Sequence, residues 1–231
     1  MSLRAMLLAA GRGERMRPLT DSTPKPLLKV QGKALIQWHI ERLVAAQITE
    51  IVVNHAWLGT QIEDYLGDGS NWGAQIRYSA ESSALETAGG IKQALPLLGS
   101  NPFLVISADV WSDWNPQLAF YLAQSLAAQS ATAHLVLVPN PPHHPQGDFS
   151  LTAGRVQHHT SNQSYTYSGI GVFDPKFFNT VPTHTPMPLR EPLHHAMAQG
   201  HVLGSVYTGT WMDIGTPERL KQIEQNLAAK A

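Results

Sequence analysis

The sequence predicts an α/β fold: a Rossmann-like, mostly parallel sheet with helices on both of its faces. Short apolar runs alternate with segments of helical periodicity through the first two thirds of the chain, a pattern typical of strand–helix–strand units. The first apolar run opens into a loop that contains Gly11 and Gly13. The 231 residues suffice for one domain with a single core, so we expect residues 1–231 to form one catalytic domain.

The predicted strands are short apolar runs bounded by turn residues. They cover residues 3–9, 50–55, 74–79, 103–107 and 133–138. Helices are predicted between them over residues 34–46, 60–66, 87–97 and 115–128. Because ligands of such sheets bind beyond the carboxyl ends of the strands, the loop at Gly11 and the strand end at Ser107 should meet at one mouth.

The alternation fades between residues 139 and 165, where Pro141, Pro142, Pro145 and Gly147 interrupt the chain. We interpret this interval as an insertion rather than a second domain. Further strands are predicted over residues 165–173, 202–207 and 211–214, and a helix over 190–199. A last helix follows Thr216, which is a good N-cap residue before a proline.

The loop after the first strand is predicted to bind phosphate. Its glycines let backbone N–H groups approach an anion. A dinucleotide-binding loop would need glycine at Met16, and a Walker loop would need lysine at Glu14, so neither common phosphate loop fits. Four cations without a compensating run of acids suit a triphosphate. They are Arg12, Arg15, Arg17 and Lys25.

Residues 8–20, with the sequence LAAGRGERMRPLT, and residues 24–27, with the sequence PKPL, resemble the signature of the sugar-1-phosphate nucleotidylyltransferases. The resemblance implies the GT-A-like fold of nucleotide-diphospho-sugar transferases, with the insertion at 139–165 as a small sugar-binding part. It implies that Arg15 and Lys25 are catalytic. It also implies nucleotide contacts from Leu8, Ala10, Gly11 and Gly13.

Two aspartates stand at predicted strand ends, where a parallel sheet presents its functional groups. Asp109 follows the run 103–108, and Asp213 lies in the segment Trp-Met-Asp-Ile-Gly-Thr at 211–216. Either one alone could be a turn residue or a helix cap. The family resemblance implies that both hold Mg²⁺ against the α-phosphate, and that Asp109 is catalytic.

The segment at 85–90, with the sequence LETAGG, opens a predicted helix with adjacent glycines, so backbone groups can meet a flat base there. The alternative is a plain helix start. The resemblance implies that Glu86 and Gly89 take part in base selection.

The sugar site is expected where the loop 141–149 faces Asn54 and Trp57. Asp148 would accept hydrogen bonds from the sugar, or would only pin its own loop. Gly169 matches the small-residue turn of the family's sugar-facing strand. Many relatives carry Glu-Lys-Pro between these segments, and its absence from 151–160 leaves the sugar-phosphate anchor open. Further tryptophans could wall this cleft or pack in the core. They are Trp72, Trp111 and Trp114.

Four shorter segments, at 54–59, 66–70, 108–111 and 142–149, are similar to the uridylyltransferases of this family that act on N-acetylmuramate 1-phosphate. The similarity implies UTP and N-acetyl-α-muramate 1-phosphate as substrates. The lactyl carboxylate of muramate needs a cation or amide partner, and Arg77, Arg155 and Arg190 are all candidates. A hexose-1-phosphate guanylyl-, cytidylyl- or uridylyltransferase is the alternative enzyme. A non-catalytic regulator that binds sugar nucleotides would be expected to lose Lys25 or the aspartates.

Composition excludes several other classes of function. A net charge of −1 argues against a nucleic-acid partner. No cysteine is present for disulfides or thiolate sites, and no apolar run is long enough to span a membrane. We expect a cytoplasmic monomer with no obligate protein partner. The histidine doublets at 143–144, 158–159 and 194–195 lack the i, i+4 spacing of helical metal ligands, so we expect solvated surface residues.

Overall fold

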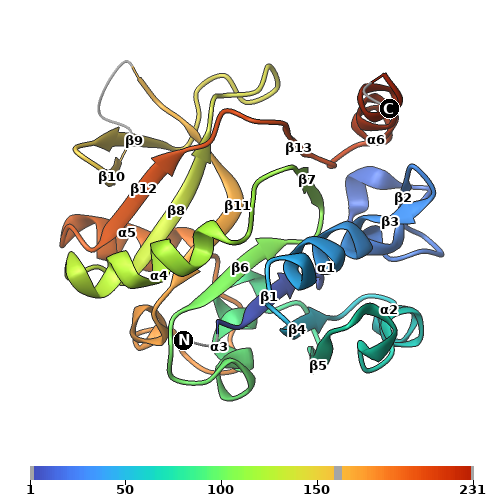
Figure 1. Ribbon diagram of the computed structural model, residues 1–231, viewed down its shortest axis with the longest axis horizontal. Helices are drawn as coiled ribbons and strands as arrows, with labels where there is room; N and C mark the ends of the chain where they lie inside the picture. The colour runs from blue at the N-terminus through green and yellow to red at the C-terminus, as the bar shows by residue number, and fades with distance from the viewer. Residues whose placement is uncertain (1–2, 159–162, 230–231) are drawn as a thin grey trace.

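The computed structural model describes residues 3–158 and 163–229. Its main sheet is built from β1 (Ala5–Leu8), β4 (Glu50–His55), β5 (Gln75–Ala80), β6 (Phe103–Ser107), β8 (Ala133–Val138), β9 (Phe149–Thr152), β10 (Arg155–His158), β11 (Thr166–Phe173) and β12 (Val202–Val206). The strand order is β5-β4-β1-β6-β11-β8-β12-β10-β9. Figure 1 shows β4 and β5 at one end of this sheet and β9 and β10 at the other.

The predicted mostly parallel sheet is confirmed. β1 runs parallel to both β4 and β6, with Ala5 opposite Ile51 on one side and Leu104 on the other. β11 is antiparallel to β6 and β8, so it reverses direction in the middle of the sheet. The carboxyl ends of β1, β4 and β6 therefore meet at one edge.

Helices cover both faces of the sheet, as predicted. They are α1 (Leu35–Ala45), α2 (Gly59–Leu66), α3 (Glu86–Leu98), α4 (Leu118–Ala128), α5 (Arg190–Ala198) and α6 (Pro217–Ala228). Successive residues of a strand point to opposite faces: Leu7 packs in a core with residues of α1, α2 and α4, and Met6 in a core with residues of α3 and α5. The strands buried on both faces explain the continuous apolar runs in the sequence.

A smaller layer lies beyond the strand ends. β7 (Val110–Ser112) pairs antiparallel with β13 (Trp211–Asp213), and β2 (Lys29–Val30) forms a hairpin with β3 (Lys33–Ala34). A third core joins Met16, Val30, Trp111 and Ile223, so α6 packs against the hairpin (Figure 1). α6 begins as predicted, because the Thr216 hydroxyl accepts a hydrogen bond from the backbone N–H of Arg219 at 3.4 Å. Short 3-10 turns are η1 (Glu14–Met16), η2 (Lys25–Leu27), η3 (Ser70–Trp72) and η4 (Pro175–Phe178).

The interval 139–165 contains two strands that the sequence analysis did not predict. β9 and β10 pair with each other, and β10 joins the main sheet through β12. Each strand has only four residues; β9 alternates apolar and polar residues, and β10 has a single apolar residue, the buried Val156, so an apolar-run criterion does not detect them. Residues 159–162 of this interval lie outside the described residues.

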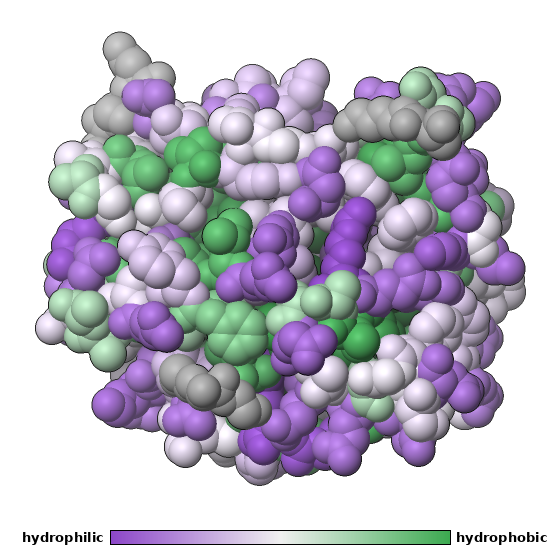
Figure 2. Space-filling model, in the orientation of Figure 1, coloured by the Kyte–Doolittle hydropathy of each residue, from purple (hydrophilic) through white to green (hydrophobic). Residues whose placement is uncertain are grey.

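No helix in the described part of the chain is long and apolar enough to cross a membrane. Figure 2 shows hydrophilic and hydrophobic side chains mixed over the visible face, with the hydrophobic ones in separate patches. This face therefore presents no continuous apolar surface.

Candidate active site

Two cavities open at the carboxyl ends of the strands, as the α/β topology predicts. The larger has a volume of about 1260 Å³ and the smaller about 520 Å³. Five residues line both of them: Leu8, Arg15, Thr87, Ser107 and Asp109. The two cavities therefore meet at the end of β6, beside Asp109.

The smaller cavity is formed by the loop that follows β1. Its walls include Ala10, Gly11, Gly13, Lys25 and Glu86, together with Leu8, Arg15 and Asp109 from the shared wall. The structure therefore brings these predicted residues together around one cavity. Contact of these residues with a nucleotide stays a prediction.

Gly13 shapes this loop through its backbone conformation. Its φ of 68° lies in the left-handed region, which favours glycine. A Cβ at this position would lie 3.1 Å from the Thr20 methyl carbon and 3.2 Å from the Cβ of Lys25. The Thr20 hydroxyl donates to the Gly13 carbonyl at 2.8 Å, so the loop closes tightly around the Lys25 side chain.

The cations of the loop are largely paired, which corrects the expectation that they lack acidic partners. Lys25 is buried, and its Nζ lies 2.5 Å from Oδ2 of Asp109. Arg17 pairs with Asp21 at 3.2 Å and lines neither cavity. Among the described residues Arg15 has no ion-pair partner, so it offers an available charge where the cavities meet.

Asn54 ties three loops together below the smaller cavity. Its Oδ1 accepts from the backbone N–H of Ala9 at 3.0 Å, and its Nδ2 donates to Glu81 at 2.6 Å. The other Glu81 oxygen accepts from the backbone N–H of Leu85 at 2.8 Å. Asn54 thereby fixes the loop after β1 relative to the start of α3.

Asn54 and Trp57 do not face the loop 141–149 as expected. Asn54 lines the smaller cavity, and Trp57 lines neither. The Trp57 indole donates to the carbonyl of Thr20 at 3.1 Å, and the Arg12 guanidinium lies 4.1 Å from the ring centroid. This cation–π contact explains the position of Trp57, because the ring is held against the phosphate-loop side of the site.

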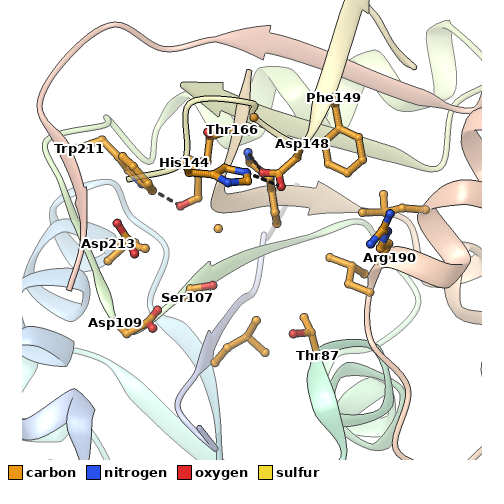
Figure 3. A pocket seen from close by; sticks show the side chains of 18 of the residues that line it. Thr87, Ser107, Asp109, His144, Asp148, Phe149, Thr166, Arg190, Trp211 and Asp213 are labelled. Carbon is orange, nitrogen blue, oxygen red and sulfur yellow. Dashed lines mark hydrogen bonds and ion pairs between the residues drawn. The ribbon is translucent and has the colours of Figure 1, made fainter. Parts of the chain in front are cut away.

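Trp72, Trp111 and Trp114 pack in or against the core, which was the alternative to lining the cleft. Trp111 and Trp114 are buried, and Trp72 packs beside Tyr65 with ring centroids 6.0 Å apart. The tryptophan that lines the larger cavity is Trp211, whose Nε1 donates to the carbonyl of Ser168 at 2.9 Å (Figure 3).

Asp109 and Asp213 come together through the ribbon of β7 and β13. The backbone N–H of Ile214 donates to the Asp109 carbonyl at 2.8 Å, and both aspartates line the larger cavity (Figure 3). The Asp213 carboxylate lies 2.8 Å from the Arg219 guanidinium and 2.9 Å from Nε2 of His143. Sequence reasoning missed Arg219 and His143; the only available signal for Arg219 was its place in the first turn of the helix after Asp213.

This carboxylate pair fits Mg²⁺. The described residues hold no cluster of three or more potential metal ligands. Mg²⁺ commonly takes one or two protein carboxylates and completes its shell with substrate phosphates and water. Asp109 and Asp213 supply two hard oxygen ligands on adjacent backbone positions of one cavity, so they are the residues that would hold the ion.

A buried histidine supports the ribbon from below. His39 of α1 lies 2.8 Å from the carbonyl of Val110 through Nε2. Burial, with a contribution from the nearby charge of Arg42, lowers the pKa of His39 to about 4. His39 is therefore neutral near pH 7, and the hydrogen bond assigns its proton to Nε2, as a donor to the strand that begins after Asp109.

Asp148 is held by its own surroundings. Oδ2 accepts from the backbone N–H of Tyr167 at 2.8 Å, and Oδ1 lies 3.0 Å from Nε2 of His144 (Figure 3). Oδ2 thus ties the loop 141–149 to β11 and Oδ1 braces the loop internally, as the alternative of a loop-pinning Asp148 predicted. Asp148 also lines the larger cavity, so contact with a sugar remains a prediction.

Gly169 lets β11 approach the floor of the site. It lines the larger cavity, and its φ is +77°. A Cβ there would lie 2.7 Å from the hydroxyl oxygen of Ser107. Glycine is therefore favoured both by the backbone and by the space beside Ser107, the strand end that the sequence analysis placed at the mouth of the site.

Gly89 lines neither cavity. A Cβ at Gly89 would lie 2.5 Å from the carbonyl oxygen of Thr185 and 3.3 Å from the N of Met187. The absence of a side chain at Gly89 allows α3 to pack closely against that backbone, and a contact of Gly89 with a base stays a prediction. Glu86, at the start of the same helix, does line the smaller cavity.

Four histidines from the doublets line the larger cavity. They are His143, His144, His158 and His194. His143 and His158 are also solvent-exposed, as expected. The fold gathers them from the proline-rich loop, β10 and α5, a proximity that sequence spacing does not reveal. His159 lies outside the described residues.

The fold and the paired cavities define a nucleotide-handling α/β enzyme. The sequence matches the nucleotidyl transferase family over residues 4–230, and the chain belongs to that family. It is 53% identical over 226 residues to the N-acetylmuramate alpha-1-phosphate uridylyltransferase of Neisseria meningitidis serogroup B, covering 96% of this chain and 97% of that protein. Identity to the enzyme of the same name from Caulobacter vibrioides is 34%, covering 97% of this chain and 96% of that protein.

More distant similarities agree with the family. Mannose-1-phosphate guanyltransferase beta-B of Xenopus laevis is 28% identical, covering 94% of this chain and 62% of that protein. A Bacillus anthracis structure described as a glucose-1-phosphate thymidylyltransferase, in complex with a sucrose, superposes with a TM-score of 0.84 at 20% identity, covering 97% of this chain and 94% of that one. At that identity the structural similarity concerns the fold.

Proposed function

We propose that this protein transfers a uridylyl group from UTP to N-acetyl-α-muramate 1-phosphate. A phosphate oxygen of the sugar phosphate forms a bond to the α-phosphorus of UTP, and the bond to the β-phosphate breaks. The products are UDP-N-acetylmuramate and pyrophosphate.

The reaction type is inferred from one observation, which is that the two cavities meet at Asp109. The smaller has the cation-bearing glycine loop, which suits a triphosphate. The larger has more than twice the volume of the smaller and mixed polar and apolar walls, which suits a sugar phosphate. A transfer reaction needs both substrates in line at one point, and the junction provides it. The identity to the two uridylyltransferases supports the choice of UTP and muramate.

The residues at the junction have distinct roles in this proposal. Buried Lys25 and accessible Arg15 neutralise the phosphates as negative charge moves to the departing pyrophosphate. Asp109 and Asp213 would hold Mg²⁺, which would polarise the phosphate oxygens when bound. Arg219 and His143 orient the Asp213 carboxylate. Asn54 keeps the phosphate loop in place.

A hexose-1-phosphate nucleotidylyltransferase is the second candidate, because guanyltransferases of mannose 1-phosphate are also similar to this chain. A non-catalytic regulator is disfavoured, since Lys25, Asp109 and Asp213 are present together. The cytoplasmic location and monomeric state stay predictions.

The test is pyrophosphate release with Mg²⁺ across UTP, GTP, CTP and dTTP, each with N-acetylmuramate, glucose or mannose 1-phosphate. We expect the highest kcat/KM for UTP with N-acetylmuramate 1-phosphate, and loss of turnover in Asp109→Asn. Asp174→Asn is the matched control, because Asp174 follows β11 and lines neither cavity. Preference for GTP with mannose 1-phosphate would contradict the proposal.

A further inference from the structure

The larger cavity contains a cluster of basic side chains, which we call the basic corner: Arg190, His194 and His158. Arg190 and His194 lie one turn apart on α5, and His158 ends β10. The Arg190 Nε lies 3.3 Å from Nε2 of His194. The His194 and His158 rings meet edge to face with centroids 4.2 Å apart. Two elements distant in sequence thus bring three nitrogen-rich groups to one place.

The basic corner has no acidic partner among the described residues. Its members contact one another, and no carboxylate forms an ion pair with any of them. Burial, together with the charges of His158 and Arg190, lowers the pKa of His194. In the phosphate loop, Lys25 and Arg17 have carboxylate partners, whereas Arg15 has none among the described residues and lies beside Asp109 where the two cavities meet. An unneutralised guanidinium beside two imidazoles is suited to an anionic ligand.

The basic corner lies across the cavity from the acidic pair. Figure 3 shows Arg190 on the side opposite Asp109 and Asp213, with Phe149 above it. Leu193 also lines this region. A ligand with its phosphate at the Asp109 junction could therefore place a second anionic group, carried on an apolar linker, at Arg190.

N-acetylmuramate has such a group, the carboxylate of its lactyl ether, which N-acetylglucosamine lacks. We propose that Arg190, supported by His158 and His194, binds the lactyl carboxylate and thereby selects muramate over sugars that lack this carboxylate. This inference rests on the proposed function. Arg77 and Arg155 are excluded from this role. Neither lines the cavity, and their guanidinium groups donate to backbone carbonyls, of Leu97 and Gly200 respectively.

The test compares N-acetylmuramate 1-phosphate with its lactyl methyl ester, which has nearly the same shape without the charge. Each is assayed by pyrophosphate release with UTP in wild type, Arg190→Gln and Arg190→Lys. We expect wild type to prefer the acid by about tenfold to a hundredfold in kcat/KM, the range for a hydrogen bond to a charged group. Arg190→Gln should bring this ratio toward one, and Arg190→Lys should keep part of it. The KM for UTP should not change.

Arg77→Gln is the matched control, since it removes a partly exposed guanidinium outside the cavity. An unchanged acid-to-ester ratio in Arg190→Gln would overturn the inference while leaving the proposed function intact. Equal losses for acid and ester would also overturn it, because Arg190 would then serve the 1-phosphate or the fold. If wild type does not use muramate 1-phosphate but turns over another sugar phosphate, the proposed function itself fails, and this inference fails with it.

Discussion

Replacing Lys25 by methionine should weaken UTP binding far more than uridine binding. Lys25 is only 7% exposed, and its ammonium lies 2.5 Å from the Asp109 carboxylate. The substitution keeps most of the apolar stem but leaves Asp109 uncompensated at the point where the triphosphate must enter. A hydrogen bond to a charged group contributes about 1.5–3 kcal/mol, which corresponds to about a tenfold to 150-fold loss in affinity for UTP. Uridine has no phosphate, so its affinity should change by about twofold at most.

Titration calorimetry of both ligands against wild type, Lys25→Met and Lys25→Arg measures this difference. Lys29→Met is the control, because Lys29 is exposed on β2 and lines neither cavity. The melting temperature of each variant shows whether the buried charge also supports the fold. Equal losses for uridine and UTP in a folded Lys25→Met protein would refute the assignment of Lys25 to the phosphates.

Three further predictions concern the metal ligands, a buried histidine and a glycine. Asp109→Asn and Asp213→Asn should each lower kcat about a hundredfold or more without unfolding the protein, and chelation of Mg²⁺ should abolish turnover; near-normal Mg²⁺-dependent kcat in either variant would remove that residue from the metal site. His39 has its pKa lowered to about 4 by burial, so its contribution to the free energy of unfolding is complete above its unfolded pKa of about 6.5 and is lost as pH falls toward 4, by about 3 kcal/mol. Urea unfolding across this range should show a shallower fall in His39→Gln, and identical pH profiles would exclude His39 as a cause. Gly169→Ala should lower both the melting temperature and the kcat/KM for sugar phosphate, because a Cβ would lie 2.7 Å from a hydroxyl oxygen at the cavity floor; unchanged values for both would show that β11 can shift freely.

Much of the fold could be predicted because its strands are buried on both faces. β1 and β6 are continuous apolar runs, and such runs between helical segments specify a parallel sheet with little ambiguity. β9 and β10 lie at the sheet edge and have only four residues each, with no continuous apolar run. Only their pairing with each other, and of β10 with β12, identifies them as strands.

The nucleotide half of the site was predictable for a related reason. Gly11, Gly13, Arg15 and Lys25 lie within one short segment, so local sequence and the family signature identify them together. Charge pairing was not predictable. The partner of Lys25 is Asp109, which the fold brings close from a distant strand end, and a count of charges along the chain cannot reveal such a contact.

The sugar half of the site depends on contacts between segments that are distant in sequence, and its charge layout is the functional information that sequence reasoning lacked. Asp213 is paired with Arg219 and His143, whereas Arg190 forms no ion pair with a carboxylate of the described residues. A cavity with paired acids at one end and an unpaired cation at the other favours one orientation of a substrate with two different anionic groups. If the aspartates hold Mg²⁺ and the phosphate binds there, Arg190 is the cation left for the carboxylate. Under the inference above, His158 and His194 of the histidine doublets then belong to the end of the cavity that receives this carboxylate.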